Sequence, residues 1–86
     1  MHEFSLINDL MEKVGATARA EHAGRIVGVK VRLGALSHIS VDHFREHFEE
    51  ACKGTIAEGA KLEVVTVTDQ ADPHAQEILL ESIDVE

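Results

Sequence analysis

The chain has 86 residues, which is enough for one small domain and too few for two independent hydrophobic cores. Sixteen acidic residues against eight lysines and arginines give a formal net charge of -8, which argues against nucleic acid and anionic membrane surfaces as partners. The single cysteine, Cys52, can form neither an internal disulfide nor a Cys-x-x-Cys zinc site, and residues 1–20 resemble neither a signal peptide nor a membrane span. These features predict a cytoplasmic protein.

The first part of the chain carries apolar residues at the three-to-four spacing of an amphipathic helix. The pattern predicts a helix from Phe4 to about Arg19, with Ser5 as its N-cap and with Ala23-Gly24 as the signal that ends it. The apolar positions are Phe4, Leu6, Ile7, Leu10, Met11, Val14 and Ala18.

Apolar and polar residues then alternate from Arg25 to Leu33, which predicts a strand with one polar face. Gly34 is expected to end this strand. The apolar face should carry Val27, Val29, Val31 and Leu33, and the polar face should carry Gly28, Lys30 and Arg32.

A second helix is predicted from Val41 to about Lys53, with Ser40 as its N-cap and Gly54 as a left-handed residue just beyond its end. Its apolar stripe should consist of Phe44, Phe48, Ala51 and Cys52.

Two further strands are predicted, from Lys61 to Thr68 and from Ile78 to Val85, with a polar loop between them that contains Pro73. The alternation changes phase between Val64 and Val65, which indicates either a bulge or a strand that is covered on both faces.

The element order is helix, strand, helix, strand, strand, which predicts an α/β fold of the α+β type with one domain over residues 1–86. The first two strands should be parallel because a helix joins them, and the last two should pair antiparallel across their short loop. We expect a three-stranded mixed sheet with two helices packed on one face. An exposed sheet edge would allow a homodimer, formed by edge pairing or by strand exchange.

The sequence begins Met1-His2-Glu3, which places three nitrogen donors within chelating reach of one metal ion. These donors are the α-amine of Met1, the backbone amide of His2 and the Nδ1 of its imidazole. Ni(II) and Cu(II) suit such a set because they tolerate a deprotonated amide and a square-planar field, which Glu3 can complete. The alternative is that the terminus frays without function, as exposed termini usually do.

Four separated segments resemble the HypA/HybF nickel metallochaperones, which mature nickel-iron hydrogenases and, in some bacteria, urease. The resemblance covers nearly the whole chain and favours the metal interpretation of His2. The segments are Met1-His2-Glu3-Phe4-Ser5-Leu6, Val31-Arg32-Leu33-Gly34-Ala35-Leu36-Ser37-His38, Gly54-Thr55-Ile56-Ala57-Glu58-Gly59-Ala60-Lys61-Leu62-Glu63 and Ser82-Ile83-Asp84-Val85-Glu86.

One departure from the family pattern concerns zinc. Family members normally carry a zinc module with two Cys-x-x-Cys pairs between the second strand and the last one, whereas here residues 69–77 form a short loop without cysteine. The sequence resembles the nickel-binding half alone, either as a naturally short member or as an engineered form. We expect no zinc.

The resemblance implies a nickel carrier, not an enzyme, with Met1, His2 and Glu3 as nickel ligands and with His38 or Asp42 as a weaker candidate for a further ligand. It also implies two partners, a HypB-like GTPase and the large-subunit precursor of a nickel enzyme. The alternative function is a metal-free protein-interaction module built on the same scaffold.

Other side chains have residue types that could form sites. His43 and His47 stand four residues apart on the second predicted helix, which suits a divalent ion held between two imidazoles, but a solvated helix face is the more common reason for such a spacing. Cys52 lies in an apolar stripe, where a small buried hydrophobe is expected. The remaining candidates are expected to face water or to form surface ion pairs, namely His22, His74, Lys30 and Arg32.

Overall fold

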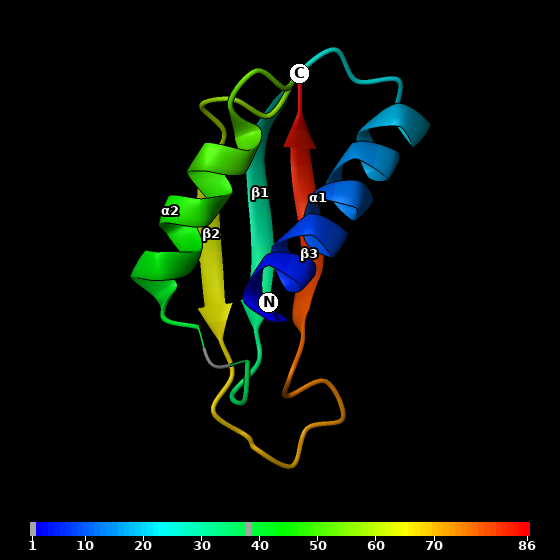
Figure 1. Cartoon of the computed structure of the whole chain (residues 1–86). Coiled ribbons are helices and arrows are strands. Elements are labelled where there is room, and N and C mark those ends of the chain that lie inside the picture. The colour runs from blue at the N-terminus through cyan, green and yellow to red at the C-terminus, as the bar shows by residue number, and fades with distance from the viewer. Residues whose placement is uncertain (1, 38) are drawn as a thin grey trace.

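The computed structural model describes the backbone of residues 2–37 and 39–86 and the side chains of residues 6–37 and 39–86. The chain forms helix α1 (His2–Ala20), strand β1 (Ile26–Leu33), helix α2 (Val41–Cys52), strand β2 (Lys61–Thr66) and strand β3 (Ile78–Val85). Both helices lie on the same face of the sheet, with α1 over β3 and α2 beside β2 (Figure 1). The predicted element order and the predicted helical layer are therefore confirmed.

The first helix begins earlier than predicted. It starts at His2, so Ser5 lies within the first turn and is not an N-cap. Consequently the backbone that carries the predicted nickel donors is already helical from residue 2.

The strand order also differs from the prediction in one pairing. The order in the sheet is β2-β1-β3, so β1 is parallel to β2 and antiparallel to β3. The predicted antiparallel pairing of β2 with β3 is wrong because residues 67–77 carry the chain past the end of β1 instead of forming a tight hairpin. In this order β2 and β3 form the two edges of the sheet. A homodimer through one of these edges stays a prediction.

At the start of β1 the buried and exposed positions differ from the predicted alternation. Ile26 is buried with 1% of its surface exposed, whereas Val27, predicted to be buried, is 36% exposed. The pairing of β1 with β3 shifts register between Ile26 and Gly28, which places one additional residue on β1 and turns Val27 outward. By contrast β2 pairs with β1 without a bulge, and its Val64 and Val65 are both half-buried.

The core lies between the sheet and the two helices. Phe44 and Phe48 of α2 are completely buried, with ring centroids 6.2 Å apart, and they pack with the apolar stripe of α1 and the inner face of β1. Burial of aliphatic and aromatic area of this kind is the main source of stability in a small domain. The other buried hydrophobic residues are Ile7, Leu10, Val14, Ala18, Ile26, Val29, Val31, Leu33, Cys52, Ala57, Leu62, Ala75 and Ile78.

The second helix has the boundaries that its sequence predicts, within one residue. Ser40 has an extended backbone and its side-chain oxygen accepts a hydrogen bond from the His43 amide at 3.1 Å, which makes it the N-cap. The helix ends at Cys52, and Gly54 follows with a φ of 77°, as a residue beyond a helix end commonly has. Over the described residues, neither helix combines the length and the apolar character that a bilayer-spanning segment needs.

Candidate metal site

The predicted nickel donors lie at the start of α1. Met1 is outside the described residues, and the structure describes the backbone of His2 and Glu3 but not their side chains. An α-helix that begins at His2 provides no carbonyl one turn earlier, so the first amides have no acceptor within the helix. Metal coordination by the His2 amide would therefore break no helical hydrogen bond.

The first turn of α2 holds another predicted ligand. Asp42 is exposed there, next to the positive end of the helix dipole, where a carboxylate stabilises the helix whether or not it binds a metal. The other weak candidate, His38, lies outside the described residues.

Further along α2, the structure brings His43 and His47 together. Their ring centroids are 4.6 Å apart and the ring planes are tilted by 33°. His43 is exposed and His47 is half-buried, while Phe44 and Phe48 point from the same helix into the core. The predicted geometry of two imidazoles one turn apart is confirmed, although a bound metal stays a prediction.

No larger group of metal ligands occurs among the side chains of residues 6–37 and 39–86, where three His, Cys, Asp or Glu side chains are never close enough to hold one ion. Within that part of the chain the two imidazoles of α2 form one pair of possible metal ligands. The terminal donor set Met1, His2 and Glu3 stays a prediction.

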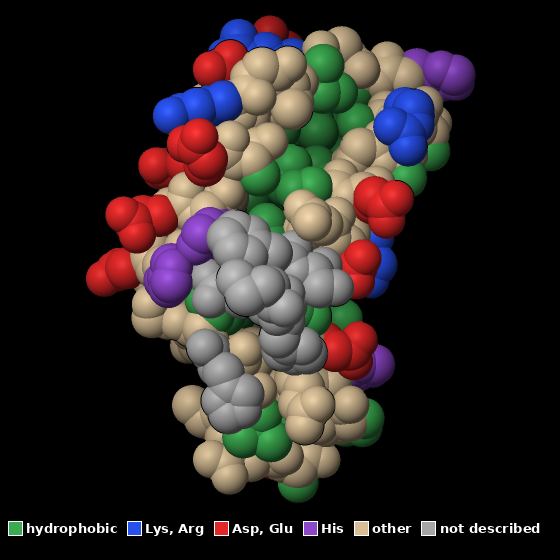
Figure 2. All heavy atoms as spheres, in the orientation of Figure 1, with side chains coloured by type: hydrophobic (Ala, Val, Ile, Leu, Met, Phe, Trp, Pro, Cys, Tyr) green, Lys and Arg blue, Asp and Glu red, His purple; other side chains and the backbone are tan. Residues whose placement is uncertain are grey.

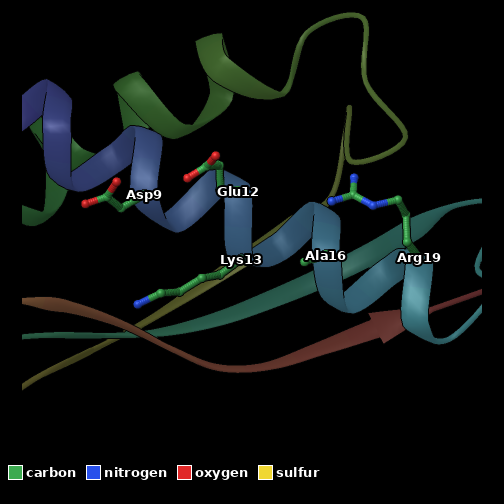
Figure 3. Close-up of a pocket in the computed structure, with 5 residues that line it drawn as sticks. All are labelled: Asp9, Glu12, Lys13, Ala16 and Arg19. Atoms are coloured by element: carbon green, nitrogen blue, oxygen red, sulfur yellow. The ribbon is translucent and has the colours of Figure 1, made fainter.

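Two hollows of the described surface lack the polar groups of a ligand site. One hollow of about 380 Å³ lies where β1 and β2 end, and small or apolar residues such as Leu33, Ile39 and Val67 line it, without an ionisable side chain. A second, shallow groove follows α1, and Figure 3 shows that its charged side chains diverge, with Lys13 extending away from Glu12 and Arg19. Neither hollow presents the convergent polar groups that a ligand site needs.

Cys52 is unsuited to nucleophilic chemistry. Its side chain is buried in the stripe of α2, with 2% of its surface exposed. Burial raises the pKa of the thiol to about 11, and the nearby charge of Glu49 adds to the rise. The thiol is therefore protonated at neutral pH, and the prediction of a small buried hydrophobe is confirmed.

The other polar candidates are on the surface. Lys30 pairs with Glu63 at 3.6 Å, and Arg32 Nε donates to a carboxylate oxygen of Glu81 at 2.6 Å, as predicted for charges on the outer face of β1. The predicted exposure of His22 and His74 is confirmed, and His74 Nδ1 lies 2.5 Å from a carboxylate oxygen of Glu77. Exposed pairs of this kind contribute little to stability and provide no site.

One structurally important side chain was missed by the sequence analysis. Arg45 reaches from α2 to β2, where its Nη1 donates a hydrogen bond to the Leu62 carbonyl oxygen at 3.1 Å. The two residues are 17 apart in the sequence, so no local pattern could identify the contact.

Comparison with known proteins agrees with the fold and gives the family. Residues 1–77 match the family model described as "HypA: Hydrogenase/urease nickel incorporation, metallochaperone, hypA". The hydrogenase maturation factor HypA of Chlorobium limicola is 42% identical over 64 residues, which cover 74% of this chain and 55% of that protein. The corresponding factor of Rhodopseudomonas palustris is 37% identical over 71 residues, which cover 83% of this chain and 63% of that protein.

The chain thus spans between 55% and 63% of the length of these two relatives. Among solved structures, the solution structure of the Ni metallochaperone HypA from Helicobacter pylori matches with a TM-score of 0.80 at 19% identity, over 99% of this chain and 97% of that one. This likeness shows the shared fold. The family match over residues 1–77 shows that the chain belongs to the HypA family of nickel-incorporation metallochaperones, which are maturation factors and not enzymes.

Proposed function

We propose that this chain carries one Ni(II) ion at its N-terminus and delivers it to the precursor of a nickel enzyme such as a nickel-iron hydrogenase. In this proposal Met1 binds nickel through its α-amine, His2 through its backbone amide and imidazole, and Glu3 through its amide nitrogen or its carboxylate. The observation that carries the proposal is the family match, which begins at residue 1 and thus includes the Met1-His2-Glu3 sequence.

The local backbone supports this donor set. Because α1 begins at His2, the amides at its start have no helical acceptor, and deprotonation there costs no hydrogen bond of the helix. The positive end of the helix dipole disfavours a bare cation but favours anionic donors. We therefore expect nickel to bind together with deprotonated amide or carboxylate ligands, which lower the charge of the complex.

Terminal donors also suit delivery. An incoming ligand can displace an amine, an imidazole and an amide one at a time without disturbing the core that α1 forms with β3. The sequence has no G-x-x-x-x-G-K-[ST] phosphate loop, so we propose that nucleotide-driven release comes from a HypB-like GTPase in the cytoplasm. We also propose that the chain binds no zinc, because its one cysteine cannot form a Cys-x-x-Cys pair.

The test is isothermal titration of Ni(II) into the chain with a free, untagged N-terminus. His2→Ala removes the imidazole and should abolish tight binding. The control substitution His74→Ala, at an exposed loop residue, should leave the nickel affinity unchanged. Equal nickel affinity in the wild type and in His2→Ala would contradict the proposal and would favour the metal-free interaction module.

A further inference from the structure

We infer that His43 and His47 of α2 form a second site for a divalent transition-metal ion, with donors other than those of the N-terminus. The site would hold an ion that prefers imidazole, of the kind represented by Ni(II), Cu(II) and Zn(II). It goes beyond the proposed function because it needs neither a free amine nor a deprotonated amide.

The geometry of the two rings carries the inference. Residues four apart on a helix lie one above the other on the same face. A metal ion about 2.1 Å from an imidazole nitrogen lies about 3.3 Å from the ring centroid, so two imidazoles at right angles around one ion have centroids about 4.6 Å apart. The observed separation of His43 and His47 is 4.6 Å, and the tilt of 33° shows that the rings are not stacked in parallel.

Another coordination geometry would need a different separation of the rings. A tetrahedral angle between the two bonds would place the centroids about 5.3 Å apart with the same bond lengths. The rings of α2 are closer than that, and their 4.6 Å separation fits neighbouring positions of an octahedral or square-planar ion.

The surroundings of the pair favour a cation. Glu46 and Glu50 are exposed on the same helix, and Asp42 lies in its first turn. Figure 2 shows histidine side chains next to acidic ones along the α2 side of the molecule. The formal net charge of the chain is -8, which attracts cations to its surface. This attraction counteracts the repulsion of a cation by the positive end of the helix dipole.

The helix supports the pair rigidly. Phe44 and Phe48, which alternate with the two histidines along α2, are completely buried and hold the helix against the core. Two protein ligands leave the other coordination positions to water, so the ion should exchange readily. Since the rings meet only while residues 43–47 are helical, bound metal should also stabilise the folded state.

The experiment uses the chain with a Gly-Ser extension before Met1, which moves the free amine away from the His2 donors. Ni(II) is titrated calorimetrically, and thermal unfolding is followed with and without the metal. We expect one equivalent of Ni(II) and a higher melting temperature in its presence. His43→Gln and His47→Gln should each weaken binding about tenfold or more, since removal of a mere hydrogen-bond partner of a metal ligand already costs about 10- to 100-fold.

The control variant is His74→Gln, an exposed histidine elsewhere on the surface, which should bind Ni(II) like the extended parent. Circular dichroism without metal verifies that all variants fold. The inference is overturned if the folded, extended chain binds no Ni(II), or if either α2 variant binds as tightly as the parent. Failure of the terminal site would instead appear in the free-terminus chain, as equal affinity before and after His2→Ala.

Discussion

Gly34 and Ala75 meet through their backbones, so closely that a Cβ on Gly34 would lie 2.3 Å from the Ala75 carbonyl oxygen. The same oxygen accepts a hydrogen bond from the Leu36 amide at 2.6 Å, and the Gly34 amide donates to the Glu77 carbonyl oxygen at 3.0 Å. Ala75 itself is buried. The loop between β2 and β3 is therefore fixed on the turn that follows β1, and only glycine fits at this position.

Gly34→Ala should lower the free energy of unfolding by about 1 to 3 kcal/mol, as overpacking in a close-packed region typically does. The added methyl group meets backbone atoms of the loop, which cannot rotate away as a flexible side chain would. Urea denaturation measures the change. Gly24→Ala is the matched control, since a Cβ there meets nothing within 4 Å and the change should be close to neutral. Equal losses in the two variants would contradict this interpretation.

The parts of the fold that the sequence predicted depend on local signals. The cap at Ser40, the apolar spacing of Phe44 and Phe48 and the glycine at position 54 each act within a few residues, and all three are confirmed. The central position of β1 could not be predicted in this way, because strand order depends on contacts between distant segments. For the same reason the bulge that exposes Val27 was missed, since β3 imposes it.

The parts of the candidate site that could be predicted also depend on local sequence. The facing of His43 and His47 follows from helical spacing alone, which the sequence provides. The terminal donors His2 and Glu3 were predicted from donor chemistry and from family resemblance. Neither of these two arguments requires knowledge of tertiary contacts. The contact of the loop between β2 and β3 with Gly34 could not be predicted from a sequence pattern, because it is made by backbone atoms of both segments.

Nickel binding at the terminus should weaken as the pH falls. Amine, imidazole and amide must each lose a proton to coordinate the metal, so protons compete with nickel at every donor. Calorimetric titrations between pH 8 and pH 6 should show a steep loss of affinity, with a planar, diamagnetic spectrum at the higher pH. A chain extended by Gly-Ser before Met1 should lack that spectrum. A pH-independent affinity, or an identical spectrum after extension, would exclude the amine and amide as donors.

Cys52 should make the fold sensitive to alkali. Burial raises the pKa of its thiol from the ordinary 9.0 to about 11, so the folded state holds this proton more tightly than the unfolded chain does. The resulting stability is complete below about pH 9 and is lost as the pH rises towards 11, by about 2 to 3 kcal/mol in all.

The measurement is urea denaturation of the wild type and of Cys52→Ala at several pH values from 8 to 11. The variant is expected to be less stable at pH 8, because it leaves a small cavity in the stripe beside Phe48. Its stability should nevertheless fall less steeply with pH than that of the wild type. Parallel curves for the two proteins would show that the thiol does not titrate differently in the folded and unfolded states.

Arg45→Met should destabilise the packing of α2 on β2. The change keeps most of the aliphatic stem of Arg45 but removes the group that donates to the Leu62 carbonyl oxygen at 3.1 Å. Hydrogen bonds from charged groups contribute about 1.5 to 3 kcal/mol, so we expect a loss in that range by urea denaturation. Arg32→Met is the control, because Arg32 is in an exposed pair with Glu81 and its loss should cost about 0 to 1 kcal/mol. If Arg45→Met costs no more than Arg32→Met, the contact with Leu62 does not hold the helix to the edge strand.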